Sequence, residues 1–337
     1  MSLYAWIYDP VSRPRAADLL PHDQPFKPWP PVRRWRFNAG LRALAFWGLF
    51  GGAMLAAGMV VVMAVLAGGG VDLLAGSQAA AQDLVEGMPL IAMVAAELVA
   101  AVAAYAVLAR GMERRRRPLE LAWRRAGGAW RGAALGFAAI GLVVGVLALL
   151  GCYRVVGFNA AYSPWADLFT LGLTAGVAEE LMFRGAVFRL LEDTFGSAWA
   201  IAADCLVFGL IHLGNADATW LGGFGIAVES LVFPGVYMAT RSLWWTMGLH
   251  FAWNVAQGPV FGSVVSGSGA ANSWLVAQWT GPEWLTGGAF GIEASVVSMA
   301  LLGGFGAWLV WRVHRSGNFV RPSWRRRRLL AAGPPPA

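Results

Sequence analysis

Residues 166–191 read ADLFTLGLTAGVAEELMFRGAVFRLL, an apolar run that carries Glu179, Glu180 and Arg184 near its centre. The run is long enough to cross a bilayer, which takes about 20 mostly apolar residues. A charged side chain at membrane depth is costly, so these three side chains must face the interior of a helix bundle or a wet cavity. The segment therefore predicts a membrane helix that turns a polar site inward.

The rest of the chain also has the composition of a membrane protein. Of its 337 residues, 58% are hydrophobic and 13% are charged, against about 25% charged in soluble domains, and the mean hydropathy is +0.55. The expected fold is therefore all-α, a polytopic membrane bundle of about eight transmembrane helices. The apolar segments that predict them are 37–67, 88–110, 129–151, 166–191, 196–213, 220–240, 243–261 and 289–313.

The basic residues indicate how the chain is oriented. The net charge is +7, and the arginines cluster beside apolar runs, as in Arg114 to Arg117 and Arg325 to Arg328. This placement is typical of cytoplasmic loops and of contact with lipid headgroups, and it argues against nucleic-acid binding. The loops at 68–87 and 262–288 contain no Lys or Arg. We therefore expect a multi-pass protein with both termini in the cytoplasm, as in the inner (plasma) membrane of a bacterium.

The expected organisation has five parts. A central core is flanked by a cytoplasmic N-terminal extension, a first group of transmembrane helices, an outside loop with the last helix, and a basic cytoplasmic tail. Their ranges are 1–36 for the extension, 37–151 for the first helices, 152–265 for the core, 266–314 for the loop and last helix, and 315–337 for the tail.

The first motif of the core, Glu179-Glu180 to Arg184, gives its two glutamates different roles. Glu180 and Arg184 are four residues apart, so they lie on one helix face and can form a structural ion pair. Glu179 lies about 100° around an α-helix from Glu180 and is free for chemistry. His212 lies in the next span, almost as far beyond the turn at 195–196 as Glu179 lies before it. Both side chains should therefore reach the same depth.

After the motif that ends at His212, a third motif in the seventh span adds two more polar groups. His250 and Asn254 are four apart in the seventh span, so both can point at one atom. Glu179 could act as a general base on water, aided by His212, and His250 with Asn254 could donate hydrogen bonds to an oxyanion. Alternatively, Glu179, His212 and His250 could bind zinc with an open fourth position. Sequence leaves the cofactor open, and we favour the metal-free route.

These motifs resemble those of the CPBP family of intramembrane proteases, which includes the type II CAAX prenyl endopeptidases. The family pattern EExxxR, FxxxH and HxxxN appears here in order, as Glu179-Glu180 to Arg184, Phe208 to His212, and His250 to Asn254. The resemblance covers roughly residues 160–260. It implies an endopeptidase that acts on a membrane-associated polypeptide from a cavity in the core, with Glu179 as base, His212 as its partner, and His250 with Asn254 at the oxyanion.

Two alternatives from other functional classes remain open. Buried Glu, His and Arg could form the relay of a proton-coupled transporter, although the sequence shows no inverted repeat. A non-proteolytic bacteriocin-immunity or membrane assembly factor could carry the same motifs. Asp204 and Glu229 belong to none of the motifs, and we expect both to serve polar packing or to line the cavity.

Overall fold

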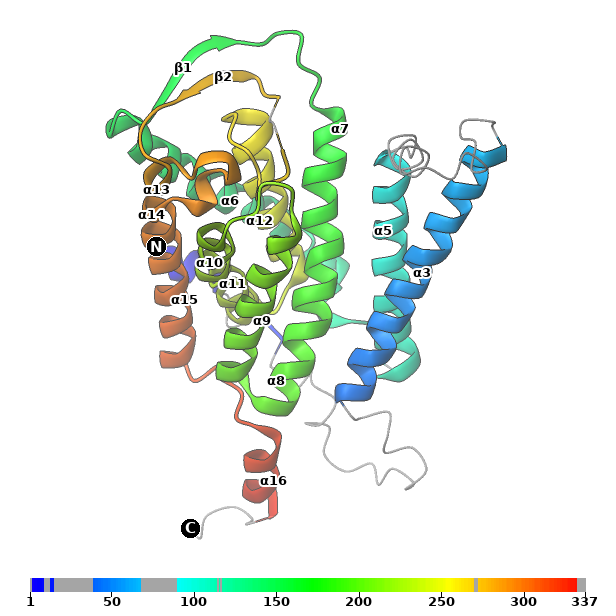
Figure 1. The fold of residues 1–337 in the computed structure, drawn as a ribbon. Coiled ribbons are helices and arrows are strands. Elements are labelled where there is room, and N and C mark those ends of the chain that lie inside the picture. Colours follow the sequence, from blue (N-terminus) through cyan, green and yellow to red (C-terminus); the bar gives the residue numbers. More distant parts are fainter. Residues whose placement is uncertain are drawn as a thin grey trace.

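The computed structural model describes residues 2–8, 13–14, 39–67, 90–113, 115, 117–269 and 272–331. The loop at 68–87, Arg114 and most of the predicted N-terminal extension lie outside this part of the chain. The described residues form an all-α helix bundle with one small sheet (Figure 1), which confirms the predicted fold class.

The helical segments follow the predicted order along the chain. They are α1 Leu3–Ile7, α3 Ala39–Ala67, α5 Leu90–Ala106, η4 Val107–Met112, η5 Leu119–Leu121, η6 Trp123–Arg125, α6 Gly128–Leu149, α7 Trp165–Asp167, η7 Leu168–Glu179, η8 Leu181–Phe188, α8 Arg189–Phe195, α9 Ser197–Ile211, η9 His212–Gly214, α10 Trp220–Glu229, α11 Val232–Thr240, α12 Leu243–Val255, η10 Ala256–Val260, α13 Glu283–Thr286, η11 Gly288–Phe290, η12 Ile292–Ala294, α14 Val296–Ser298, η13 Met299–Gly303, α15 Gly304–Arg315 and α16 Ser323–Ala331.

Six helices in the described part of the chain are long and apolar enough to cross a membrane. They are Gly40–Val60, Ala92–Met112, Trp123–Leu149, Ser197–Gly214, Trp220–Thr240 and Val296–Arg315. The predicted fourth and seventh spans are helical as well but are not among the six, because their polar motif residues lower their apolar character. The predicted sixth span consists of two helices, α10 and α11, which are separated at Ser230 and Leu231.

One long helix from Trp165 to Phe195 runs through the molecule (Figure 1). It consists of α7, η7, η8 and α8, and η7 and η8 are wound as π-helix. A π-helix bonds each N–H to the carbonyl five residues back, and such turns are frequent at functional sites. The helix ends at Gly196, whose φ of 84° turns the chain into α9. This is the predicted turn between the fourth and fifth spans.

The long helix has neighbours on two sides. In Figure 1, α3 and α5 form a pair on one side of it, while α6, α9 to α12 and α15 gather on the other. Helix α5 packs against η7, and α3 packs against α8. The predicted N-terminal helices therefore contact the core helix directly.

Helices α6 and α12 approach each other closely because glycines line their contact. A Cβ at Gly132 would lie 2.0 Å from the Trp245 carbonyl oxygen, and one at Gly136 would lie 2.3 Å from that of Leu249. Small residues at such spacing let helix backbones touch in a membrane. This contact fixes α12, which carries His250 and Asn254, against the rest of the bundle.

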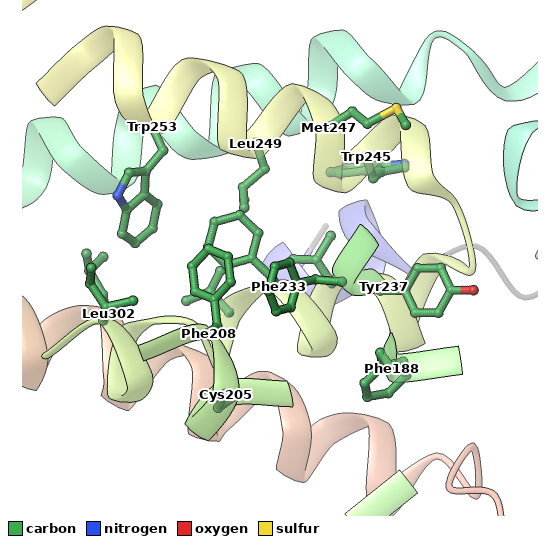
Figure 2. Packing of buried hydrophobic residues seen from close by; sticks show 14 of the residues in the cluster. Phe188, Cys205, Phe208, Phe233, Tyr237, Trp245, Met247, Leu249, Trp253 and Leu302 are labelled. Carbon is green, nitrogen blue, oxygen red and sulfur yellow. The ribbon is translucent and has the colours of Figure 1, made fainter. Parts of the chain in front are cut away.

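Aromatic side chains fill the core around the polar motifs. Figure 2 shows Phe208 and Phe233 close together, with Leu249 and Trp253 of α12 beside them. The ring of Phe233 lies 5.6 Å from that of Trp253. The motif residue Phe208 is therefore a packing residue between α9 and the helices that hold the site.

Two features were not predicted from the sequence. The strands β1 Tyr153–Phe158 and β2 Leu275–Trp279 pair antiparallel over one end of the bundle (Figure 1), with Tyr153 opposite Trp279. The first residues of the chain pack against the bundle, because Tyr4 and Ile7 of α1 are buried and α1 contacts α11. This part of residues 1–36 is therefore not a free extension.

Candidate active site

A cavity of about 270 Å³ lies between the long helix and helices α9 to α12. Glu179, His212, His250 and Asn254 all line it, and so does Phe208. The four residues come from η7, η9 and α12, which are far apart in the sequence. The structure thus brings the four predicted candidates to the wall of one cavity.

Glu180 connects two of the three sequence motifs. Its Oε1 accepts a hydrogen bond from Arg184 Nη1 at 2.9 Å and lies 2.9 Å from His250 Nδ1. The side chains of Glu180 and Arg184 are fully buried. The ion pair expected from the sequence is present, and it also holds His250, a contact that the i, i+4 spacing could not indicate.

Arg184 is enclosed by aromatic rings and a second carboxylate. Its guanidinium carbon lies 4.9 Å from the ring centre of Phe208 and 4.6 Å from that of Phe233. A cation over an aromatic face is attracted by the ring quadrupole. Asp204 adds an ion pair, with 3.6 Å between its Oδ2 and Arg184 Nε. Asp204 thus serves the buried polar packing that the sequence analysis expected of it.

The hydrogen bond to Glu180 constrains the chemistry of His250. A carboxylate paired with arginine only accepts, so His250 Nδ1 carries the proton of that bond. In the neutral imidazole, Nε2 is then an acceptor, and it becomes a donor only in the imidazolium form. Nε2 faces Glu179, whose Oε2 is 3.9 Å away. His250 can therefore stabilise a developing oxyanion only when it is protonated, with both glutamates near its charge.

His212 is in the same tautomer as His250. Its Nδ1 lies 2.7 Å from the Phe208 carbonyl oxygen. Because a carbonyl oxygen cannot donate, Nδ1 must carry a proton, which leaves Nε2 as the acceptor of the neutral ring. Both neutral histidines thus carry a proton on Nδ1 and an acceptor at Nε2, and they differ in that His250 Nδ1 bonds a carboxylate whereas His212 Nδ1 bonds a backbone carbonyl.

Glu179 and Asn254 complete the set. The Glu179 side chain is 23% exposed, and within the described part of the chain its Oε2 has no hydrogen-bond partner. Asn254 donates from Nδ2 to the Leu171 carbonyl at 3.2 Å, so one of its two N–H groups is used by the long helix. The second N–H and all of Glu179 Oε2 remain for a substrate or a water.

The sequence analysis missed three cavity residues. Glu97 lies on α5 and Glu293 on η12, and both line the cavity together with Thr174. Both glutamates lie in apolar segments, at 88–110 and 289–313, that carry none of the three motifs. An isolated glutamate in each apolar run was the available signal. The cavity wall therefore extends beyond the predicted core at 152–265.

The arrangement of donors bears on the zinc alternative. Among the described residues, no three His, Cys, Asp or Glu side chains are arranged so that they could hold a metal ion. His250 Nδ1 is occupied by Glu180, and its Nε2 is 3.9 Å from Glu179. Glu179, His212 and His250 thus share a cavity without forming a ligand set.

Comparison with known proteins identifies the part of the chain that holds these residues. No curated protein and no solved structure matches the chain. The model of the family described as type II CAAX prenyl endopeptidase Rce1-like matches residues 161–256. This segment contains all three motifs, whereas Glu97 and Glu293 lie outside it. The match confirms, over the segment that carries the motifs, the resemblance of this chain to the CPBP family of CAAX-type intramembrane proteases.

Proposed function

We propose that the protein is an intramembrane endopeptidase that cleaves a membrane-associated polypeptide with a water activated by Glu179 and His212. The observation that carries the proposal is that Glu179, His212, His250 and Asn254 line one cavity within the membrane bundle. The family match over residues 161–256 supports the same class of reaction.

The hydrogen bonds around the cavity support a sequence of proton transfers. A water between Glu179 and His212 Nε2 loses a proton to the Glu179 carboxylate, and its oxygen attacks the scissile carbonyl carbon. The negative charge on the carbonyl oxygen is stabilised by the second N–H of Asn254 and by Nε2–H of protonated His250. When the C–N bond breaks, Glu179 returns the proton to the leaving amine.

Glu180 and Arg184 support this sequence from outside the cavity. The carboxylate of Glu180 accepts from His250 Nδ1 and so fixes the orientation of the ring. In this proposal Glu180 and Arg184 position His250 and do not touch the reacting atoms.

The test uses the full-length protein in lipid nanodiscs with a degenerate library of peptides, each prepared with and without a prenylated cysteine. Cleavage is followed by mass spectrometry. Glu179→Gln preserves the shape of the side chain but removes the base, so the rate should fall by about 10²- to 10⁴-fold. Both arms are needed because the matched family is named for prenyl substrates, whereas the cavity itself does not identify one.

The same assay addresses the metal question. We expect cleavage to persist after exhaustive chelation, in protein shown to be metal-free by elemental analysis. A loss of activity on chelation that zinc restores would refute the metal-free route. A lack of cleavage of every peptide by the wild-type protein, with correct folding shown by gel filtration, would refute the proposed function itself.

A further inference from the structure

Glu229 is a buried carboxylate without an ion-pair partner in the described part of the chain. It ends α10, is 2% exposed, and lines the cavity. Neither of its carboxylate oxygens has a hydrogen-bond partner there. A buried polar group left unsatisfied in a membrane protein is costly and marks a functional site by default. The proposed mechanism does not use Glu229.

The neighbouring Glu293, unlike Glu229, has several hydrogen-bond donors within the chain. Its carboxylate accepts from Trp253 Nε1 and Gln257 Nε2, both at 3.2 Å, and from the backbone N and Oγ of Ser266, both at 2.8 Å. These four donors satisfy Glu293 within the chain. Among the described residues Glu229 has only the neutral hydroxyl of Ser298 near it, so no cation of this part of the chain balances its charge.

A close backbone contact brings the two carboxylates to the same part of the wall. The short helix η12, which carries Glu293, packs on α10, and Gly225 lies one turn before Glu229. A Cβ at Gly225 would lie 2.0 Å from the Glu293 carbonyl oxygen, so only glycine permits this approach. The proximity of η12 to α10 is thus built into the sequence of α10.

The remaining wall indicates the charge of the missing partner. Glu97 also lines the cavity, and none of the described residues that line it is Lys or Arg. Apolar side chains stand between the polar ones, among them Ile226, Phe233 and Trp253. A long cationic side chain suits such a wall, because its stem packs on apolar surface while its charged head reaches a carboxylate.

We propose that Glu229, with Glu293 beside it, forms a subsite that binds an arginine or lysine side chain of the polypeptide in the cavity. The inference rests on the proposed function for the identity of the ligand as a polypeptide. It names a substrate class, a segment with a basic residue near the scissile bond. Arginine fits best, since its planar fork can bond two carboxylate oxygens at once.

Binding can be measured separately from cleavage. Full-length protein with Glu179→Gln, which should hydrolyse the peptide far more slowly than the wild type, is placed in phosphatidylcholine nanodiscs. Two pools of fluorescent degenerate octapeptides are titrated, one with arginine at a fixed position and one with citrulline, its uncharged isostere. The arginine pool should bind about tenfold to a hundredfold more tightly, the range for a charged hydrogen-bonded pair.

Substitution of Glu229 then tests the subsite. Adding Glu229→Gln should reduce the preference for arginine to within about twofold, with the affinity for the citrulline pool unchanged. Glu283→Gln, which removes an exposed glutamate of α13, is the matched control and should leave the preference intact. Equal binding of the two pools before this substitution, or a preference that survives Glu229→Gln, would overturn the proposal.

The outcome is independent of proteolysis. If the arginine preference depends on Glu229 but the wild-type protein cleaves no peptide, the subsite stands and the proposed endopeptidase function fails. If the wild-type protein cleaves the library and the two pools bind equally, the endopeptidase stands and the subsite fails.

Discussion

Replacing Arg184 with methionine should unfold much of the protein, because it leaves two buried carboxylates without their cation. Arg184 is fully buried, bonds Glu180 at 2.9 Å and lies 3.6 Å from Asp204. Removing one partner of a buried ion pair typically costs about 3–5 kcal/mol. At about 1.4 kcal/mol per tenfold change, this corresponds to a loss of roughly 10²- to 10⁴-fold in the folding equilibrium. Methionine retains most of the side-chain volume, so the loss reports mainly on the charge.

The assay is thermal unfolding in detergent, together with the yield of monodisperse protein. Arg315→Met, at an exposed arginine of α15, controls for the type of substitution and should change the stability by less than about 0.5 kcal/mol. Glu179→Gln should be equally mild, because Glu179 is proposed to act in chemistry and not in folding. Combining Glu180→Gln with Arg184→Met should cost less than the sum of the two single variants. Equal destabilisation by Arg184→Met and Glu179→Gln, or additive losses in the double variant, would refute the reasoning.

Two further predictions concern stability. Gly132→Ala should destabilise the fold by about 1–3 kcal/mol, because its Cβ would lie 2.0 Å from the Trp245 carbonyl oxygen. Gly145→Ala on the same helix is the control and should be tolerated, because its Cβ would meet open space. Similar melting temperatures for the two variants would contradict the close α6–α12 contact. Burial raises the pKa of Glu120, but Arg115, at 2.7 Å, together with Arg189 and the Tyr105 hydroxyl, outweighs it and leaves that pKa below its ordinary value. Because the folded pKa is the lower one, this stabilisation is complete above about pH 4.3 and is lost as the pH falls through the folded pKa. Melting temperatures from pH 7 to pH 3 should show this decline, and Glu120→Gln should flatten it.

The sequence could predict the fold class and the three motifs because both depend on local properties. Hydropathy over about 20 residues identifies a span whatever its neighbours are. The cost of a charge in lipid makes each intramembrane Glu, His or Arg conspicuous. The same rule applies to Glu97 and Glu293, each of which is an isolated glutamate in an apolar segment, so their place in the cavity wall was predictable from the sequence as well.

Other features depend on which helices touch, and a linear sequence does not state that. Glu180 contacts His250 across 70 residues, and that bond sets which ring nitrogen of His250 faces the cavity. The π-helical winding of the long helix and the loss of one Asn254 N–H to Leu171 are equally invisible to a periodicity of 3.6. The sequence determined that the protein is a membrane bundle with a glutamate–histidine site. The tertiary structure decided which glutamate holds a histidine and which faces the cavity, because hydrogen bonds between distant helices form only once the backbones are packed.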